Sequence, residues 1–226
     1  MRRLDVGVVL VAAGLGTRLG APQPKAFVRV AGATLLEHAV ARALESAGTA
    51  QVVVVAPASH LGEAGALLSA HPRAADVTVV AGGTERSQSV AAGLSALRDD
   101  LDIVLVHDAA RCLAPAALFE RLAAAVRAGH DAVVPGQHVA DTIKQVDVDG
   151  RVVATPERSA LRAIQTPQAF RRSVLTDAHA SGADATDDAA LVERAGGTVL
   201  VIDGDDLAFK VTTPADLDRA GRILGS

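Results

Sequence analysis

Two glycines and two cations follow the first apolar run of the chain at a spacing that suits phosphate binding. Gly14 and Gly16 end the aliphatic run, and Arg18 and Lys25 follow in a loop rich in glycine and proline. Glycine lets the backbone approach an anion closely, and two nearby cations suit a polyphosphate better than a neutral ligand. From these residues alone, the alternative is an ordinary strand-to-helix turn with surface cations.

The spacing of this loop does not fit the two commonest phosphate-binding motifs. A dinucleotide fingerprint would need a third glycine at the position of Leu19. A Walker A loop would need glycine directly before its lysine and Ser or Thr after it, whereas Lys25 lies between Pro24 and Ala26. The loop therefore belongs to neither motif.

A second glycine pair, Gly82 and Gly83, follows a later apolar run and precedes a helical stretch that contains Ser89. In a parallel sheet this pair would lie beside the first loop. Aromatic residues make up only 2% of the chain, so few rings can stack on a base. We therefore expect backbone groups to contact the base edge, with Ser89 adding a hydroxyl. An ordinary turn and helix cap is the alternative.

Asp108 ends the fourth apolar run, and Arg111 lies three residues further on. An acidic residue at the C-terminal tip of a central strand can hold Mg²⁺ against phosphates, and arginine can bind a second phosphate bidentately. Asp108 is therefore the predicted metal ligand. The adjacent His107 is a candidate for acid–base chemistry, although a histidine at a strand end is more often structural.

Four further polar groups from later segments suit a phosphate-bearing ligand. They are Arg158, Thr166, Thr186 and Lys210. Each of them alone is equally typical of a cap, a turn or a surface charge, so their meaning depends on whether the fold brings them together.

Composition limits the classes of partner. The formal net charge of −4 argues against a general nucleic-acid surface, which needs a basic balance. No segment is long enough to span a membrane. The single cysteine, Cys112, permits neither an intrachain disulfide nor a cysteine-based zinc site. We therefore expect a cytoplasmic protein that handles anions at a local cationic site, without nucleic-acid or membrane partners.

The elements that must position these residues alternate along the chain. Apolar runs predict strands at 6–13, 51–56, 77–81, 103–107, 132–135 and 198–202. Stretches with helical spacing lie between them at 34–47, 60–70, 86–97, 115–128 and 187–195. This alternation predicts an α/β, Rossmann-like fold, with a mostly parallel sheet and helices on both faces. We expect residues 1–226 to form a single domain.

One segment, residues 140–154, breaks the alternation. Its apolar residues alternate around Asp149-Gly150, a dipeptide that favours tight hairpin turns. A hairpin has no seat inside a doubly wound core, so we expect a projecting β-hairpin arm at about residues 138–158. Its apolar character indicates packing on a second subunit, which predicts a homodimer. The alternative is an antiparallel flap over the chain's own site.

Taken in order, these motifs resemble the 2-C-methyl-D-erythritol 4-phosphate cytidylyltransferase family. The matching segments are Ala12–Arg18 with Pro24-Lys25, Gly82-Gly83 with Arg86 and Ser89, Val106–Arg111, Asp141-Thr142, Thr166–Gln168 and Lys210–Thr212. The resemblance runs from about Val8 to Leu217. The first loop by itself signals only a nucleotidyltransferase, and the segments around Asp108 and Thr166 narrow the resemblance to this family.

The resemblance implies a fold of the nucleotide-diphospho-sugar transferase type and an enzyme that uses Mg²⁺ or another divalent cation. Its reaction would transfer CMP from CTP to 2-C-methyl-D-erythritol 4-phosphate and release pyrophosphate. The implied roles are catalysis for Arg18, Lys25 and Lys210; nucleotide binding for Ala13, Gly14, Gly16, Gly82, Gly83 and Ser89; metal binding for Asp108; and acceptor binding for Arg111, Thr142, Arg158, Thr166, Thr186 and Lys210. Thr142 and Arg158 would come from the arm of the other subunit.

Two alternatives remain open at the level of sequence. A ribitol 5-phosphate cytidylyltransferase would share the loop and the fold, and would differ around Thr142, Arg158 and Thr186. A non-catalytic nucleotide-binding module would keep the glycines, but would not need Lys25, Asp108 and Lys210 together. In either enzyme the acceptor is a phosphate monoester that is largely dianionic at neutral pH, so it can attack without a general base.

Overall fold

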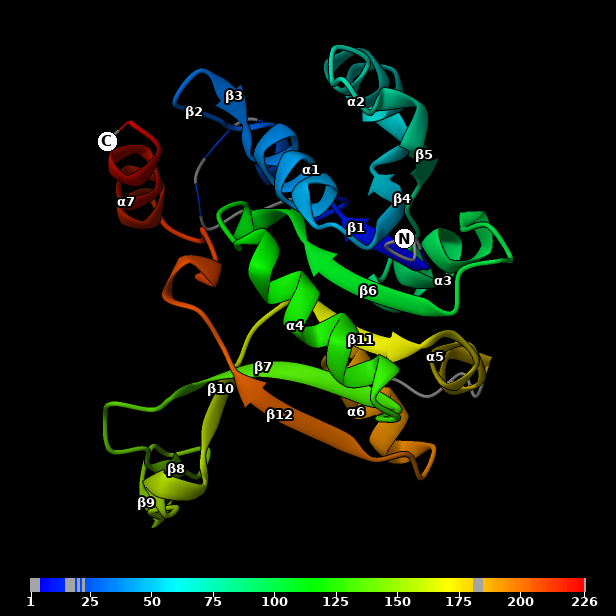
Figure 1. Cartoon of the computed structure of the whole chain (residues 1–226). Coiled ribbons are helices and arrows are strands. Elements are labelled where there is room, and N and C mark those ends of the chain that lie inside the picture. Colours follow the sequence, from blue (N-terminus) through cyan, green and yellow to red (C-terminus); the bar gives the residue numbers. More distant parts are fainter. Residues whose placement is uncertain (1–4, 15–18, 20, 22, 181–184, 226) are drawn as a thin grey trace.

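The computed structural model describes residues 5–14, 19, 21, 23–180 and 185–225. An eight-stranded sheet forms the centre of the molecule, with the order β10-β7-β11-β6-β1-β4-β5 and with β12 paired to β7 (Figure 1). Its strands are β1 (Val6–Val11), β4 (Thr49–Ala56), β5 (Val77–Ala81), β6 (Ile103–Asp108), β7 (Ala132–His138), β10 (Arg162–Ile164), β11 (Gln168–Arg171) and β12 (Val199–Asp203). All six strands predicted from the apolar runs are present.

The sheet is mostly parallel, as predicted. Strand β1 pairs in parallel with β4 on one side and β6 on the other, β4 pairs in parallel with β5, and β12 with β7. Strand β11 runs antiparallel between β6 and β7, and β10 runs antiparallel to β7. These two short strands were not predicted, because three or four residues carry too little periodicity to identify them.

Helices cover both faces of the sheet (Figure 1). They are α1 (Leu35–Glu45), α2 (Leu61–Leu68), α3 (Arg86–Ala96), α4 (Ala116–Arg127), α5 (Arg172–Ala180), α6 (Asp188–Arg194) and α7 (Pro214–Leu224). Side chains of β1 alternate between the two layers, since Val8 and Leu10 pack in the cluster that contains α1 and α4, whereas Val9 packs with α3 and α5. Burial on both faces explains the unbroken aliphatic run of this strand. No helix within the described ranges is both long and apolar enough to cross a membrane.

Two short hairpins complete the fold. One pairs β2 (Arg29–Val30) with β3 (Ala33–Thr34), and the other pairs β8 (Gln145–Val146) with β9 (Val152–Ala154). The second is the predicted arm. Its turn contains Gly150 at a φ of +80°, a conformation that glycine adopts without strain.

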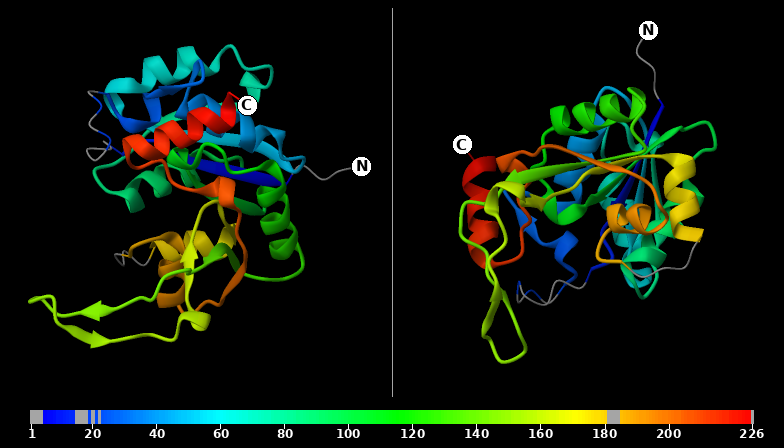
Figure 2. Two further views of the ribbon diagram at one scale, coloured as in Figure 1. Left: turned by 90° about the vertical axis from the view of Figure 1, so that its left-hand side faces the viewer. Right: turned by 90° about the horizontal axis from the view of Figure 1, so that it is seen from below.

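The arm extends away from the body of the molecule, rather than folding back as a flap (Figure 2). Its apolar side chains are exposed, from Ile143 at 40% to Val148 at 103% of the reference area, with Val146, Val152 and Val153 between these values. An apolar surface on a projecting element is typical of a surface that another molecule covers.

Candidate active site

A cleft opens where the chain leaves the C-terminal ends of β1 and β6. Its walls come from residues 11–14 at and just after the end of β1, residues 83–86 and Ser89 before and within α3, residues 108–110 at and just after the end of β6, residues 25–26 and Lys210. The chain crosses from β1 to β4 on one side, and β6 lies on the other side, so this cleft occupies the switch point where open α/β sheets bind ligands.

The two glycine loops meet at one wall of the cleft. A Cβ atom on Gly82 would lie 2.8 Å from the Cβ of Ala13 and 2.8 Å from the Oγ of Ser89, so only glycine allows this approach. Ala13, Gly14 and Gly83 line the cleft itself. The structure therefore brings the two loops together, as the parallel arrangement predicted.

Ser89 is buried beneath this wall, with 1% of its surface exposed. Its hydroxyl accepts a hydrogen bond from the Gly83 N–H at 3.2 Å and donates to the Glu85 carbonyl at 3.1 Å. Ser89 thus holds the loop in shape while it lines the cleft, and its direct contact with a base stays a prediction.

Asp108 lies at the tip of β6, opposite the glycine loops. Its Oδ2 accepts a hydrogen bond from the Lys210 Nζ at 2.6 Å, and its Oδ1 lies 3.8 Å from a terminal nitrogen of Arg86. Burial acts to raise the pKa of Asp108, but Lys210, Arg86 and Arg111 outweigh it and lower the pKa to about 2. The carboxylate is therefore ionised at neutral pH.

The carboxylate of Asp108 suits one particular mode of metal binding. Within the described ranges, no three His, Cys, Asp or Glu side chains gather into a metal-binding group. Mg²⁺ usually keeps several waters and binds one or two carboxylates together with substrate phosphates. A single ionised carboxylate in a cationic cleft fits that mode, so Asp108 is the residue that would hold Mg²⁺ beside a nucleotide.

Lys25 begins a single turn of 3-10 helix, Lys25–Phe27, and lines the cleft. The buried side chain of Phe27 anchors this turn in the core below the cleft. Arg18 and Gly16, which were predicted from the same loop, lie outside the described residues.

Arg111 and Thr166 lie behind the tip of β6. The Nη1 of Arg111 donates to the Ala208 carbonyl at 2.7 Å, and its Nε is buried without a hydrogen-bond partner. The Thr166 Oγ1 accepts a hydrogen bond from the Asp108 N–H at 3.0 Å and lies 3.0 Å from the His107 Nδ1. Thr166 therefore supports the backbone that presents Asp108, whereas Arg111 binds the backbone of the segment that precedes Lys210.

His107 is fully buried, and its ring packs edge-on against Phe119 with 5.0 Å between the ring centroids. Burial lowers the pKa of His107 to about 4, so the imidazole is neutral at pH 7. These surroundings favour the structural interpretation of His107 over acid–base catalysis.

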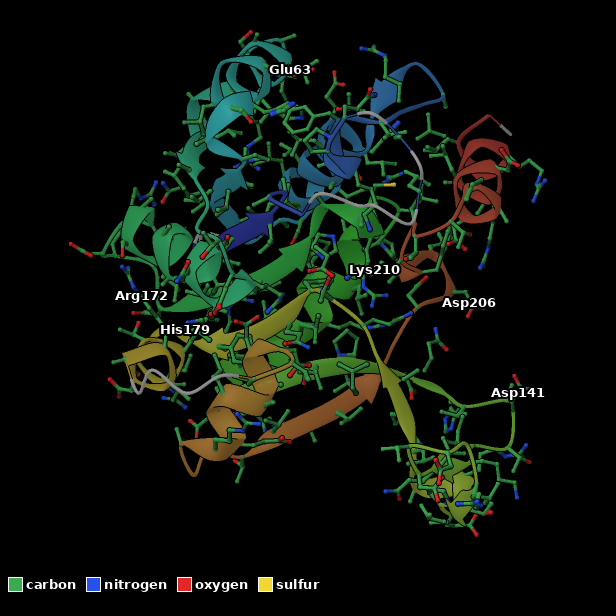
Figure 3. All side chains as sticks on the ribbon, turned by 180° about the vertical axis from the view of Figure 1, so that it is seen from behind. Glu63, Asp141, Arg172, His179, Asp206 and Lys210 are labelled. Atoms are coloured by element: carbon green, nitrogen blue, oxygen red, sulfur yellow. The ribbon has the colours of Figure 1, made fainter. Side chains whose placement is uncertain are left out.

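The remaining predicted acceptor residues are spread over two places. Thr186 is exposed just before α6, where Asp187 caps the helix by accepting a hydrogen bond from the Ala190 N–H at 2.9 Å. Thr142 and Arg158 belong to the arm, and Figure 3 shows the neighbouring Asp141 far from Lys210. The chain therefore does not bring its own Thr142 and Arg158 to its own cleft.

One cleft residue had no role assigned from the sequence. Arg86 lines the cleft at the first position of α3, and its Nη1 donates to the Oδ2 of Asp188 at 2.7 Å. An arginine three residues after the Gly82-Gly83 pair is a signal in the sequence. Its partner could not be predicted, because Asp188 is 102 residues away.

The fold and the cleft together define an α/β nucleotidyltransferase: a glycine-loop wall faces an ionised carboxylate and lysines at the switch point of the sheet. Residues 6–226 match the family model described as IspD, 2-C-methyl-D-erythritol 4-phosphate cytidylyltransferase. The chain belongs to this family.

Curated relatives support this membership over nearly the whole chain. It is 52% identical over 223 residues to the 2-C-methyl-D-erythritol 4-phosphate cytidylyltransferase of Rhodococcus opacus, covering 98% of this chain and 96% of that protein. It is also 53% identical over 222 residues to the bifunctional enzyme IspD/IspF of Clavibacter michiganensis, covering 97% of this chain. The matched region spans 54% of that longer relative.

Solved structures of the same family share the fold. The 4-diphosphocytidyl-2C-methyl-D-erythritol synthase of Anaerococcus prevotii superposes with a TM-score of 0.86 at 28% identity, covering 98% of this chain and 96% of that one. The 2-C-methyl-D-erythritol 4-phosphate cytidylyltransferase of Thermus thermophilus superposes with a TM-score of 0.77 at 34% identity, and each chain is covered completely.

Proposed function

We propose that this chain is a cytidylyltransferase that transfers CMP from CTP to 2-C-methyl-D-erythritol 4-phosphate and releases pyrophosphate. The observation that carries the proposal is the ionised Asp108 between Lys210 and Arg86, opposite a wall made by two glycine loops. Membership of the family supports the choice of both substrates. A single, buried cysteine is consistent with a cytoplasmic localisation, where thiols stay reduced.

The glycine-loop wall would bind the cytidine part of CTP. Backbone groups of Ala13, Gly14, Gly82 and Gly83 line or support this wall, and Ser89 holds its shape. Backbone N–H and C=O groups can recognise the edge of a pyrimidine without aromatic stacking. This mode suits a chain with four phenylalanines and neither tyrosine nor tryptophan.

The cationic side of the cleft would drive the chemistry. The acceptor phosphate, largely dianionic at neutral pH, attacks the α-phosphorus of CTP, and the bond to pyrophosphate breaks. Because the nucleophile is already ionised, the attack needs no general base, which agrees with the full burial of His107 away from the lining of the cleft. Lys25, Lys210 and Arg18 would offset the charge that develops on the transferred phosphoryl group. Mg²⁺ held by Asp108 and the phosphates would supply further positive charge.

The acceptor side would need a second subunit. Arg111, Thr166, Thr186 and Lys210 come from the chain's own body, whereas Thr142 and Arg158 lie on the arm. We infer that residues 1–226 form a single domain and that the arm, residues 138–158, mediates dimerisation. The exposed apolar side chains of the arm support this role. In such a dimer each arm would bring Thr142 and Arg158 to the cleft of the partner.

A pyrophosphate-release assay tests the function directly. We expect release with CTP and Mg²⁺ when 2-C-methyl-D-erythritol 4-phosphate is present, and little release when ribitol 5-phosphate replaces it. Preference for ribitol 5-phosphate would contradict the acceptor while leaving the nucleotidyl transfer intact. Failure to release pyrophosphate with either acceptor would contradict the proposed function as a whole.

Mixed dimers test the role of the arm. Lys25→Ala and Arg158→Ala should each be nearly inactive alone, because every cleft then lacks one required cation. After random mixing of the two variants, half of the dimers are mixed and each has one complete cleft, so about a quarter of wild-type activity should return. Sedimentation would verify that subunits have exchanged. No recovery after exchange would contradict a shared cleft.

A further inference from the structure

A hydrogen-bonded network of three buried or partly buried side chains reaches the cleft. Arg86 at the start of α3 donates from Nη1 to Asp188 Oδ2 at 2.7 Å, and the other oxygen of Asp188 lies 3.0 Å from the Nε2 of His179. Asp188 begins α6, and His179 belongs to α5. The three residues thus join three helices that each contribute buried side chains to one core cluster. His179 is labelled in Figure 3.

Asp188 is completely buried, and the side chain of His179 is 8% exposed. A buried carboxylate is costly to desolvate, and a buried ion pair is often no more stable than apolar residues of the same volume. Stability alone is therefore a weak reason for an ionised pair at this position. Asp188 also lies directly behind an arginine that lines the cleft, so a role in ligand binding is the other explanation for the pair.

The guanidinium of Arg86 has two edges with different surroundings. One edge is bound to Asp188, and the second terminal nitrogen lies 3.8 Å from the Oδ1 of Asp108, too far for a hydrogen bond. Arginine presents its donors in a rigid planar fork, so fixing one edge sets the direction of the other. Asp188 therefore determines how Arg86 faces the carboxylate and the cleft.

The length of the arginine side chain makes this restraint important. A long, rotamer-rich side chain loses conformational freedom when it binds a ligand, and that loss is smaller if the side chain is already held. Arg86 lines the cleft together with Lys25 and Lys210, which form its cationic side. An anionic ligand in the cleft would meet a guanidinium that is already oriented.

We propose that Asp188 and His179 are positioning residues that aim Arg86 at the phosphate chain of the nucleoside triphosphate, beside Asp108. Arg86 contacts the ligand, whereas Asp188 and His179 act through Arg86. The inference rests on the proposed function for the identity of the nucleotide. It extends that function by adding a cation and its support, which come from helices α3, α5 and α6.

Titration calorimetry of CTP, with and without Mg²⁺ and without acceptor, tests the proposal separately from turnover. Asp188→Asn keeps the shape of the side chain but removes its charge, and we expect CTP affinity to fall about 10- to 100-fold, the range found for residues that orient metal ligands through a hydrogen bond. In steady-state assays the KM for CTP should rise more than kcat falls. Glu45→Gln is the matched control, because it removes a carboxylate from the exposed Arg42–Glu45 pair.

A double-mutant cycle separates positioning from general structural support. If Asp188 acts through Arg86, then Arg86→Met, Asp188→Asn and the double variant should lose similar CTP affinity, so the effects are not additive. His179→Gln keeps a donor for Asp188 and should bind CTP nearly as well as the wild type, whereas His179→Ala should bind several-fold more weakly.

Two results would overturn the proposal. One is an Asp188→Asn protein with a lower unfolding temperature but unchanged CTP affinity when folded, which would make the pair purely structural. The other is additive loss in the double variant. If Asp188→Asn does not fold, His179→Ala and Arg86→Met decide the question in the same binding assay, and unchanged affinity in both refutes the proposal. A wild-type chain that binds CTP but releases no pyrophosphate would refute the proposed function alone.

Discussion

Lys210→Met removes the cation nearest to the carboxylate of the cleft. The Lys210 Nζ lies 2.6 Å from the Asp108 Oδ2, and two unit charges at that distance attract by about 6 kcal/mol at an effective dielectric constant of 20. The side chain of Lys210 is 42% exposed, so solvent screens much of this energy. The shift in the pKa of Asp108 gives a smaller energy for the stabilisation of its charge. Its decrease from 3.8 to about 2 corresponds to about 2 kcal/mol in favour of the ionised form.

The pKa-based value is the better guide to the net field at Asp108, because it includes the opposing cost of burial, and Lys210 makes the largest contribution among the cations that lower this pKa. Loss of one preorganised donor in other enzymes typically costs about 3 to 4 kcal/mol. We therefore expect Lys210→Met to lose about 2 to 4 kcal/mol of transition-state stabilisation, which is about a 30- to 1000-fold decrease in kcat/KM.

The assay is steady-state pyrophosphate release with both substrates and Mg²⁺ varied, together with CTP binding and thermal unfolding. Lys210 and Mg²⁺ would compete for the same carboxylate, so the Mg²⁺ concentration for half-maximal activity should stay constant or fall. Arg42→Met, in an exposed pair on α1, is the control and should remain fully active. Wild-type kcat/KM in a folded Lys210→Met protein would refute the reasoning. Complete recovery at high Mg²⁺ would refute it equally, because Lys210 would then act only through the metal.

Two further predictions concern Lys25 and His107. Lys25→Ala should keep the fold, as judged by circular dichroism and thermal unfolding, and should lose about 100- to 1000-fold in turnover because one preorganised cation is missing; near-normal rates with CTP and Mg²⁺ would contradict this role. For His107, the folded-state pKa of about 4 lies below the ordinary value of 6.5, so the unfolded chain binds more protons between these values. The free energy of unfolding should therefore decrease as the pH falls from about 6.5 to about 4, by up to about 3 kcal/mol from this group. His107→Gln should remove that part of the slope in denaturant titrations, and an unchanged slope would contradict the assignment.

Much of the fold was predictable, because the signals for its main elements are local. The run Val6–Val11 is aliphatic throughout since β1 is covered on both faces, and the same reasoning identified β4 and β6. The arm was predictable from alternating apolar residues around a turn that needs a positive φ at Gly150. Strand β11 was not predictable, since its place between β6 and β7 depends on pairing with residues more than thirty positions away.

The features of the candidate site likewise divide into those that the sequence predicted and those that it did not. Gly82, Lys25 and Asp108 were predicted from residue type and from their places at the ends of apolar runs, and the cleft gathers all three regions. The sequence did not indicate that the Thr166 hydroxyl accepts a hydrogen bond from the Asp108 N–H, because the two residues are 58 positions apart.

The sequence by itself therefore determined the order of six strands and five helices, the two glycine loops and the acidic strand tip, because apolar periodicity and glycine turns are properties of neighbouring residues. Only the tertiary structure decided which charges face each other. Lys210 neutralises Asp108, and Asp188 holds Arg86, across 102 residues in each case. Such pairs carry no local signature, since their partners are chosen by how the sheet and its helices pack.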